Sequence, residues 1–451
     1  MALEVGKLSL WDTLRFQCRV SVPAFLWGLA APNRMLVGLL VRWNAGEATN
    51  RFLSGLRQKY RSSYLRLWFP FSATLLVMDP QGMDAVMASA DNAADPDLKK
   101  RTLSQFVPDS LVISCDPEWP VRRAFNVSVL QFGERLHPHA DAFTQVITAE
   151  VARFAKERGP ELRWEDFEAL AERISHQVLL GEGCVDPEMT AQLAQVVKRS
   201  NWYLLPRASA AFAAFYARLE GYLARHGAEA KGDAASTSCL MADSAALLAS
   251  HPPTPVTSAS TQIAFWFFVI KDALEINMAK TLALLASHPD VYDRVQREID
   301  AMQAPAARAI DGLDYLEGCI AEGLRLWTPV PILLRRVRRS FPVVDGVTVN
   351  EGEKVLIHAG FYHRDVEYFG NDANRFAPRQ GSADPSPRLY FFSAGRQSCA
   401  GQFVARFLLK ATLASLLKAA RFELLGPRTG TDPVPHLYDH FKIRLRIHPQ
   451  P

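Results

Sequence analysis

The stretch Phe392-Ser393-Ala394-Gly395-Arg396-Gln397-Ser398-Cys399-Ala400-Gly401 decides how this chain is interpreted. It places one cysteine between two glycines, directly before an apolar stretch in which Gln402, Arg406 and Lys410 recur at four-residue steps. That spacing predicts a helix that begins just after the cysteine. Because a helix N-terminus favours negative charge, the sequence predicts that Cys399 is held as a thiolate.

A thiolate presented by such a loop suits a haem iron. A cysteine ligand pushes electron density onto the iron and favours O–O cleavage. Gly395 and Gly401 lack a Cβ, so they tolerate strained dihedral angles or let a macrocycle approach the backbone. Phe392 can shield the sulfur from water, while backbone N–H groups donate to it. The alternative is that Cys399 is an ordinary buried thiol, as most single cysteines are.

This segment resembles the haem-binding signature of the cytochrome P450 family. The family's positions are occupied by Phe392, Gly395, Cys399 and Gly401. The resemblance implies haem b as cofactor, Cys399 as metal ligand, and a mostly α fold with small β-sheets in a single haem domain over residues 1–451. One position departs from the pattern: Gln397 stands where a basic residue usually meets a haem propionate, and Arg396 is displaced by one.

Composition limits the classes of function. The chain has 451 residues, of which 49% are hydrophobic, so it can bury a large core. A net charge of +4 without a Lys/Arg block argues against a nucleic-acid partner. Six cysteines without C-x-x-C spacing argue against a disulfide framework or a zinc site. We therefore expect a reducing compartment and a cytoplasmic location.

The N-terminal 60 residues predict helices. Val22–Trp43 is apolar, but prolines and arginines interrupt it before about twenty apolar residues have accumulated. We expect two short helices here and no stable membrane span, although a shallow contact with a membrane surface stays open. The first ten residues lack the order of a cleavable signal peptide.

The rest of the chain is helix-rich and strand-poor. Regions 61–80 and 343–357 predict β-hairpins, the first around Pro70 and the second with Asp345-Gly346 as its turn. Near the C-terminus, charged and apolar residues alternate over 442–447 and predict a half-buried strand. Long amphipathic stretches predict helices over 138–157, 186–204 and 291–302. Residues 228–256, rich in Ala, Ser and Pro, predict a connection with short helical pieces.

Glu322 and Arg325 share one face of a predicted helix. Alone, such a pair is worth a few tenths of a kcal/mol, roughly, and Glu150 and Arg153 have the same spacing. Two further segments follow in the order of the family, His363-Arg364-Asp365 and Asn374-Arg375-Phe376. Together with these segments, the Glu322–Arg325 pair resembles, in family order, the ExxR helix and the segment whose arginine completes a buried Glu-Arg-Arg network. The resemblance implies a structural role for Glu322, Arg325 and Arg375 on the proximal side of the haem.

Trp119 and Arg123 are four apart on a predicted helix, so they project to one side. Buried propionates need cationic partners, and the resemblance implies that this WxxxR pair donates to one of them. The alternative is a solvated arginine that packs its stem along Trp119. Arg335 and Arg336, ten and eleven residues after Arg325, fall where a further propionate-binding arginine is expected, and Arg335 is our choice.

Residues 258–287, followed by His288-Pro289, predict the long helix that crosses the distal face of the haem in the family. Counting back from Pro289, the acid–alcohol pair that relays protons to oxygen falls on Asp272 and Ala273. The acid is present, and the family's threonine is missing. A bulky stretch precedes the pair, formed by Phe265, Phe268, Val269 and Ile270.

Plainer interpretations of this helix also stay open. A phenylalanine stripe is often core, and the carboxyl of Asp272 could be solvated or paired with Lys271 or Lys280. The missing hydroxyl weakens the case for ordinary oxygen activation. Some relatives without it use a substrate hydroxyl or an ordered water, and others carry out isomerase, dehydratase or peroxide-driven chemistry.

Together the motifs predict a haem-thiolate monooxygenase that oxidises an apolar or aromatic small molecule. No G-x-G-x-x-G motif occurs, so electrons are expected from a separate ferredoxin or flavodoxin, docking near Arg396, Arg406 and Arg122. Two alternatives are a haem-thiolate enzyme that needs no external reductant and a non-catalytic haem-binding protein. The segments expected to line the substrate pocket are apolar, and they are 106–113, 202–215, 265–272 and 329–333.

Overall fold

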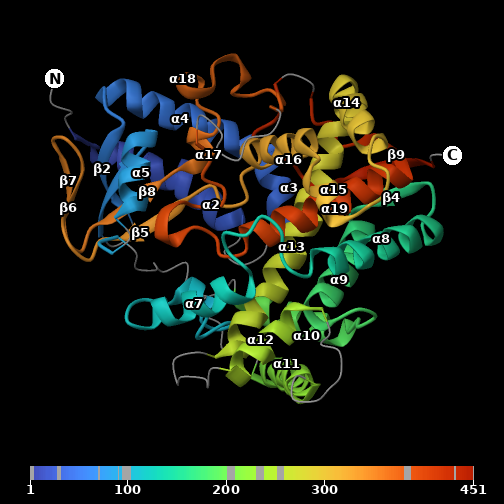
Figure 1. Cartoon of the computed structure of the whole chain (residues 1–451). Helices are drawn as coiled ribbons and strands as arrows, with labels where there is room; N and C mark the ends of the chain where they lie inside the picture. The colour runs from blue at the N-terminus through green and yellow to red at the C-terminus, as the bar shows by residue number, and fades with distance from the viewer. Residues whose placement is uncertain are drawn as a thin grey trace.

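The computed structural model describes residues 5–27, 32–69, 72–89, 91–93, 103–200, 209–229, 238–250, 258–379, 388–430 and 433–449. Helices predominate in this part of the chain, and the strands form small sheets (Figure 1). The predicted fold class, mostly α with small β-sheets, is confirmed.

Helix α13 (Ala259–Ser287) runs through the centre of the molecule (Figure 1). Its N-cap is Ser258, whose hydroxyl accepts a hydrogen bond from the N–H of Thr261, and Pro289 begins the next helix. These bounds are those expected for the distal helix. The helices that pack against α13 include α9 (Trp164–Leu180), α16 (Asp314–Leu326) and α19 (Gln402–Ala419).

The predicted amphipathic stretches are helices, and more helices surround them. They are α8 (Ala140–Glu157), α10 (Pro187–Ser200) and α14 (Pro289–Asp300), with α11 (Ser209–Glu229), α12 (Leu240–Ser250) and α15 (Ala307–Asp311). Helix α12 lies within the segment expected to be a loose connection. The rest of that segment falls largely on 230–237 and 251–257, which lie outside the described residues.

The N-terminal region is helical, as predicted. Helix α1 (Leu10–Phe16) continues through a π-helical turn (Gln17–Ser21) into α2 (Val22–Trp27). Helices α3 (Arg34–Arg42) and α4 (Ala45–Tyr60) follow. Among the helices that the structure describes, none is long and apolar enough to cross a membrane.

The largest sheet has the strand order β1-β2-β3-β8-β5 and begins with the short strand β1 (Gly6–Lys7). Strands β2 (Tyr64–Phe69) and β3 (Ser72–Val77) form the predicted antiparallel hairpin, although Pro70 at its turn lies outside the described residues. The hairpin predicted over 343–357 does turn at Asp345-Gly346, but the prediction is wrong in its extent, because the hairpin ends at Val349. Strands β6 (Phe341–Val344) and β7 (Val347–Val349) pair around Gly346, whereas β8 (Lys354–Ile357) joins the large sheet between β3 and β5 (Leu333–Arg336).

Three short strands near the C-terminus form another sheet, in the order β4-β10-β9. They are β4 (Glu161–Arg163), β9 (Ala420–Gly426) and β10 (Arg444–Pro449). The half-buried strand predicted here is confirmed, because Leu445 is fully buried between exposed arginines. Short helices complete the fold around the site, namely α5 (Pro80–Ala88), α7 (Glu118–Val129), α17 (Ala359–Tyr362) and α18 (Val366–Phe369).

Candidate active site

The cysteine loop leads directly into helix α19. Gly395–Gln397 form one 3₁₀ turn, and the N–H of Cys399 donates to the carbonyl oxygen of Phe392 at 2.8 Å. Helix α19 begins at Gln402, three residues after the cysteine. The loop therefore holds Cys399 at a helix N-terminus, where the helix dipole favours negative charge.

The Cys399 sulfur is accessible but closely surrounded by protein. Its side chain is exposed by accessible area, yet desolvation raises the pKa of the thiol. A hydrogen bond from the backbone N–H of Gly401 and the charge of Arg123 act in the opposite direction and lower the pKa. The protein thus supplies a donor and a cation to a thiolate at this position.

The two loop glycines have different reasons to be glycine. Gly395 adopts φ +63°, and a Cβ on it would lie 2.4 Å from the carbonyl oxygen of Met87. A larger residue is excluded there both by its backbone angle and by the neighbouring chain. Gly401 has an ordinary φ of −96°, and a Cβ on it would lie 3.6 Å from its nearest neighbour, a side-chain carbon of Leu130. The expectation of a strained angle applies only to Gly395.

Arg123 and Trp119 both lie on helix α7 and reach the cysteine loop. The guanidinium of Arg123 donates to the carbonyl oxygen of Ser398 at 2.7 Å, one residue before the cysteine. Its pKa is lowered by desolvation. The ring of Trp119 lies 4.7 Å from the guanidinium carbon of Arg396, which gives the displaced basic residue a cation–π contact.

Arg335 is a buried cation beside the same loop. Strand β5 turns its side chain inward, with 7% of the residue exposed, and turns Arg336 to solvent. Its guanidinium donates to the hydroxyl of Ser393 at 3.2 Å, but no carboxylate among the described residues pairs with it. Desolvation lowers its pKa to about 10. An unpaired buried guanidinium needs an anion, and a haem propionate is one.

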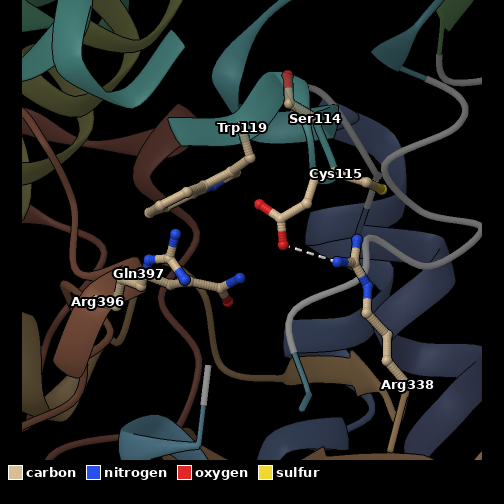
Figure 2. A pocket seen from close by; sticks show the side chains of 7 residues that line it. Ser114, Cys115, Trp119, Arg338, Arg396 and Gln397 are labelled. Atoms are coloured by element: carbon tan, nitrogen blue, oxygen red, sulfur yellow. Dashed lines mark hydrogen bonds and ion pairs between the residues drawn. The ribbon is translucent and has the colours of Figure 1, made fainter. Parts of the chain in front are cut away.

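A small pocket separates α7 from the cysteine loop (Figure 2). Trp119 forms one side, Arg396 and Gln397 form the other, and an ion pair of 2.9 Å between Asp116 and Arg338 closes it. Its volume is about 10 Å³, which is room for roughly one water molecule. Gln397 therefore lies beside the predicted propionate-binding groups, and the pocket itself is too small for a ligand.

Helix α13 is buried over most of its length, but one stripe of its side chains is accessible to solvent. The half-exposed side chains recur with helical spacing at Phe265, Phe268, Val269, Asp272, Ala273 and Ile276. Residues spaced in this way share one helix face. The predicted acid–alcohol positions and most of the predicted bulky stretch therefore line one accessible space, while Ile270 is buried.

Asp272 is a partly exposed carboxyl whose pKa is raised by the protein around it. Its carboxyl makes no hydrogen bond to any residue that the structure describes. Burial raises its pKa to about 6, with the charge of Lys271 opposing and that of Glu168 adding to the shift. The ammonium of Lys271 is instead 2.7 Å from Glu275. The simple pairing of Asp272 with Lys271 is thus not found.

Glu322 and Arg325 form a buried ion pair at the end of α16. Both guanidinium nitrogens that face Glu322 donate to it at 2.7 Å, and Arg325 is 2% exposed. Arg325 also donates to carbonyl oxygens of the segment 363–375. The carbonyl oxygen of Arg375 accepts a hydrogen bond of 3.1 Å from the guanidinium of Arg325, but Arg375 itself is exposed. The expectation that Arg375 is buried within this network is therefore wrong.

Two buried side chains near this site received no role from the sequence. The guanidinium of Arg364 donates hydrogen bonds to the carbonyl oxygens of Leu326, Val434 and Pro435 and to the side chain of Asn374. Gln262 on α13 accepts from the N–H of Leu111 at 2.8 Å and donates to the carbonyl oxygen of Asp109 at 2.7 Å. Neither had a local signal beyond being polar within an apolar stretch.

The predicted cluster of arginines for an electron donor is incomplete. Arg122 is buried and donates to the hydroxyl of Ser114 at 2.7 Å. Arg406 is engaged by Glu317. Arg396 remains partly exposed and pairs with Asp91. Of the three arginines, only Arg396 has the exposure that the prediction required.

The described residues form a mostly α fold whose cysteine loop leads into α19, and comparison with known proteins gives it a context. A family model described as cytochrome P450 matches residues 276–440. An aromatase from Callithrix jacchus is 31% identical over 160 residues, which cover 34% of this chain and 31% of that protein. Human cytochrome P450 4A22 is 33% identical over 175 residues, covering 37% and 33% respectively. The chain matches about a third of the length of these curated relatives.

Solved structures resemble nearly the whole fold. A retinoic acid-bound cyanobacterial CYP120A1 has a TM-score of 0.71 at 17% identity, over 88% of this chain and 94% of that one. CYP175A1 from Thermus thermophilus has a TM-score of 0.65 at 18% identity, over 98% and 100%. The described residues thus share the fold of these cytochrome P450 structures, and the cytochrome P450 family model matches the C-terminal part of the chain.

The cofactor of this family is haem b, and the residues of this chain fit it. Cys399 offers an accessible sulfur with a backbone donor, and Arg335 offers a buried cation without a described carboxylate partner. Helix α13, which packs against α19, offers an accessible and mostly apolar face. Arg123, Trp119 and Gln397 would hold the propionate side, a role that stays a prediction.

Proposed function

We propose that this chain is a haem-thiolate monooxygenase that oxidises an apolar or aromatic small molecule. One observation carries the proposal: the accessible thiol of Cys399 at the start of α19 is matched by an accessible stripe on α13, which packs against α19. Bound haem supplies an iron that binds and reduces oxygen, and a thiolate ligand favours O–O cleavage. The side chains of the stripe then position the substrate and supply protons.

Asp272 is the proton donor in this proposal. A carboxyl with a pKa of about 6 holds a proton part of the time at neutral pH, which suits general acid catalysis. Ala273 offers no hydroxyl to pass the proton on, so a substrate hydroxyl or an ordered water must bridge the gap. We therefore expect electrons to be coupled to product only when the right substrate is bound.

An apolar substrate is supported by the side chains around the stripe. Phe268 packs edge to face against Phe106 at 5.8 Å, and Gln262 fixes the backbone of 109–111 against α13. Two of the predicted lining segments therefore meet. Residues 202–208 of a third predicted lining segment lie outside the described residues.

An acidic electron donor of the ferredoxin or flavodoxin type is part of the proposal. It would dock near Arg396, since Arg122 is buried. A charge reversal at Arg396 should slow reduction, most strongly at low salt, because salt screens such steering. Substrate affinity should not change. A cytoplasmic location is supported by six free cysteines.

A second candidate is a haem-thiolate enzyme that uses peroxide directly or rearranges or dehydrates its substrate without external electrons. Ala273 favours it, because the residue provides no hydroxyl for proton relay, and so does the bulky stripe at Phe265 and Phe268. A third candidate is a non-catalytic haem-binding protein, which would retain the thiolate loop and would likewise lack a hydroxyl at the position of Ala273.

Turnover experiments separate the candidates. The haem-loaded protein is screened for compounds that shift its haem absorption band, and hits are incubated either with reductant, a donor protein and O₂ or with hydrogen peroxide alone. Product that requires reductant supports the proposal. Product with peroxide alone favours the second candidate, and no product under either condition favours the third. In the first case, Ala273→Thr should keep haem binding and change the fraction of electrons lost as peroxide.

A further inference from the structure

A second cavity lies away from the cysteine loop, between the N-terminal helices and the centre of the fold. Its volume is about 120 Å³, and its lining includes Trp27 of α2, Leu40 of α3, Ile332 and Leu437. Helices α2 and α3 lie near α13 and α16 in Figure 1. None of the described lining residues belongs to the cysteine loop or to the accessible stripe of α13. Pro331 and Ile332 in its lining come from the predicted substrate-lining segment 329–333, but the proposed oxidation assigns no role to the cavity's other side, around Trp27 and Lys280.

Lys280 of α13 is the unusual residue in the lining. It is 7% exposed, and its ammonium makes no hydrogen bond or ion pair with any residue that the structure describes. Its described contact is with the ring of Trp27, 6.0 Å from the nitrogen to the ring centroid. A cation–π contact is worth about 0.5–2 kcal/mol, whereas burying an unpaired ammonium costs several kcal/mol, roughly. Trp27 alone does not offset that cost.

Other buried lysines of α13 and α19 have acidic partners. Lys271, on the same helix, lies 2.7 Å from Glu275. Lys410 of α19 lies 3.0 Å from Glu317. Lys280 therefore departs from the pattern of its neighbours, and the departure coincides with a cavity.

The other polar groups of the cavity do not supply an anion. Its described lining contains no aspartate or glutamate. Arg364 is a further cation, but carbonyl oxygens and Asn374 already accept from its nitrogens. His358 is buried and His436 is half-buried, and desolvation lowers the pKa of each to about 4, so both are neutral at pH 7. Burial likewise lowers the pKa of Lys280, to about 8, and leaves it mostly protonated at pH 7.

We propose that this cavity binds a molecule with an apolar body and a single carboxylate, and that the carboxylate pairs with Lys280. The apolar walls remove the body from water, and the ammonium gains the charged hydrogen-bond partner that the protein lacks. Carboxylate binding here does not depend on the proposed oxidation and would hold for a non-catalytic protein as well.

Calorimetric titration of the haem-loaded protein with octanoate and with octan-1-ol tests the proposal. The two probes share an apolar chain and differ in charge. We expect octanoate to bind at least tenfold more tightly than octan-1-ol at pH 7. Lys280→Met should remove that preference, while Lys442→Met, at a lysine whose side chain is 72% exposed, should keep it. Equal affinity of the wild type for the two probes would overturn the proposal, as would tight octanoate binding by Lys280→Met.

Two further measurements keep the test decisive. Leu437→Trp should fill the cavity and lower the affinity for both octanoate and octan-1-ol. Unchanged affinities in this variant would mean that the two probes bind elsewhere. Lys280→Met removes an unpaired charge, so its thermal unfolding midpoint should equal or exceed that of the wild type. A clear drop in that midpoint would mean that the ammonium already has a partner within the protein, and this result also contradicts the proposal.

Discussion

Replacing Glu322 with alanine should destabilise the fold strongly. The Glu322 carboxylate accepts two hydrogen bonds of 2.7 Å from Arg325 and one of 3.1 Å from the N–H of Ala377. It is the only carboxylate among the described residues that is paired with Arg325. The variant therefore leaves a guanidinium that is 2% exposed without a counter-charge.

The size of the effect follows from that burial. Removing one partner of a buried ion pair costs about 3–5 kcal/mol. The carbonyl oxygens of His363, Ala373 and Asp372 still accept from Arg325, which places the charge term near the lower end. The N–H of Ala377 loses its acceptor, which adds about 1 kcal/mol. A total of about 4 kcal/mol is a large share of the 5–15 kcal/mol, roughly, that stabilises a typical protein.

The measurement is the yield of haem-loaded protein together with its urea midpoint. Glu322→Ala should give little haem-loaded protein and a much lower midpoint. Glu47→Ala is the matched control, because Glu47 pairs with Arg51 at the surface, where side-chain exposures are 44% and 75%. Surface pairs contribute about 0–1 kcal/mol, so this control should be close to wild type. If both variants had wild-type yield and midpoint, the reasoning about the buried pair would be refuted.

Three further predictions concern proton supply, the cysteine loop and acid stability. Asp272→Asn should depress reductant-driven turnover far more than peroxide-driven turnover, because hydrogen peroxide brings its own protons; equal losses would contradict this. Gly395→Ala should lower haem content and the urea midpoint more than Gly352→Ala, since both have positive φ but only Gly395 lacks room for a methyl group; similar losses would argue against the close packing on Met87. Burial alone would raise the pKa of Glu150, but hydrogen bonds from Arg173, Arg153 and Gln177 outweigh it and lower the pKa to about 2. Glu150 therefore stabilises the fold above pH 4.5 and loses this effect as the pH falls towards 2, so Glu150→Gln should flatten the loss of stability measured in urea across that window, and an unchanged slope would rule out this role.

The sequence was sufficient where local chemistry determines structure. The bounds of α13 follow from Ser258 as N-cap and Pro289 as the start of the next helix. The turn geometry of the cysteine loop follows from Gly395, whose backbone angle a residue with a Cβ rarely adopts. In β5, alternation of side chains decides between Arg335 and Arg336 once the strand is known to be half-buried.

Long-range pairing was beyond the sequence. Strand β8 pairs in parallel with β3, which lies far away in the sequence, and nothing near Lys354 indicates that partner. The spacing of Glu150 and Arg153 predicted only a weak pair, yet Arg173 from α9 joins them in a network around the buried Glu150 carboxylate. Arg122 was expected at the protein surface. It is buried instead, and its guanidinium donates to the hydroxyl of Ser114, which lies before helix α7. In each case a partner outside the local motif determines the burial.

The nature of the iron ligand is the central claim, and one spectrum tests it most directly. Reduced protein with carbon monoxide should show the strongly red-shifted absorption band of thiolate-ligated haem. Cys399→Ser should lose that band, and Cys115→Ser, at the cysteine beside the small pocket near Trp119, should keep it. Persistence of the band in Cys399→Ser would contradict the account, because another group would then hold the iron.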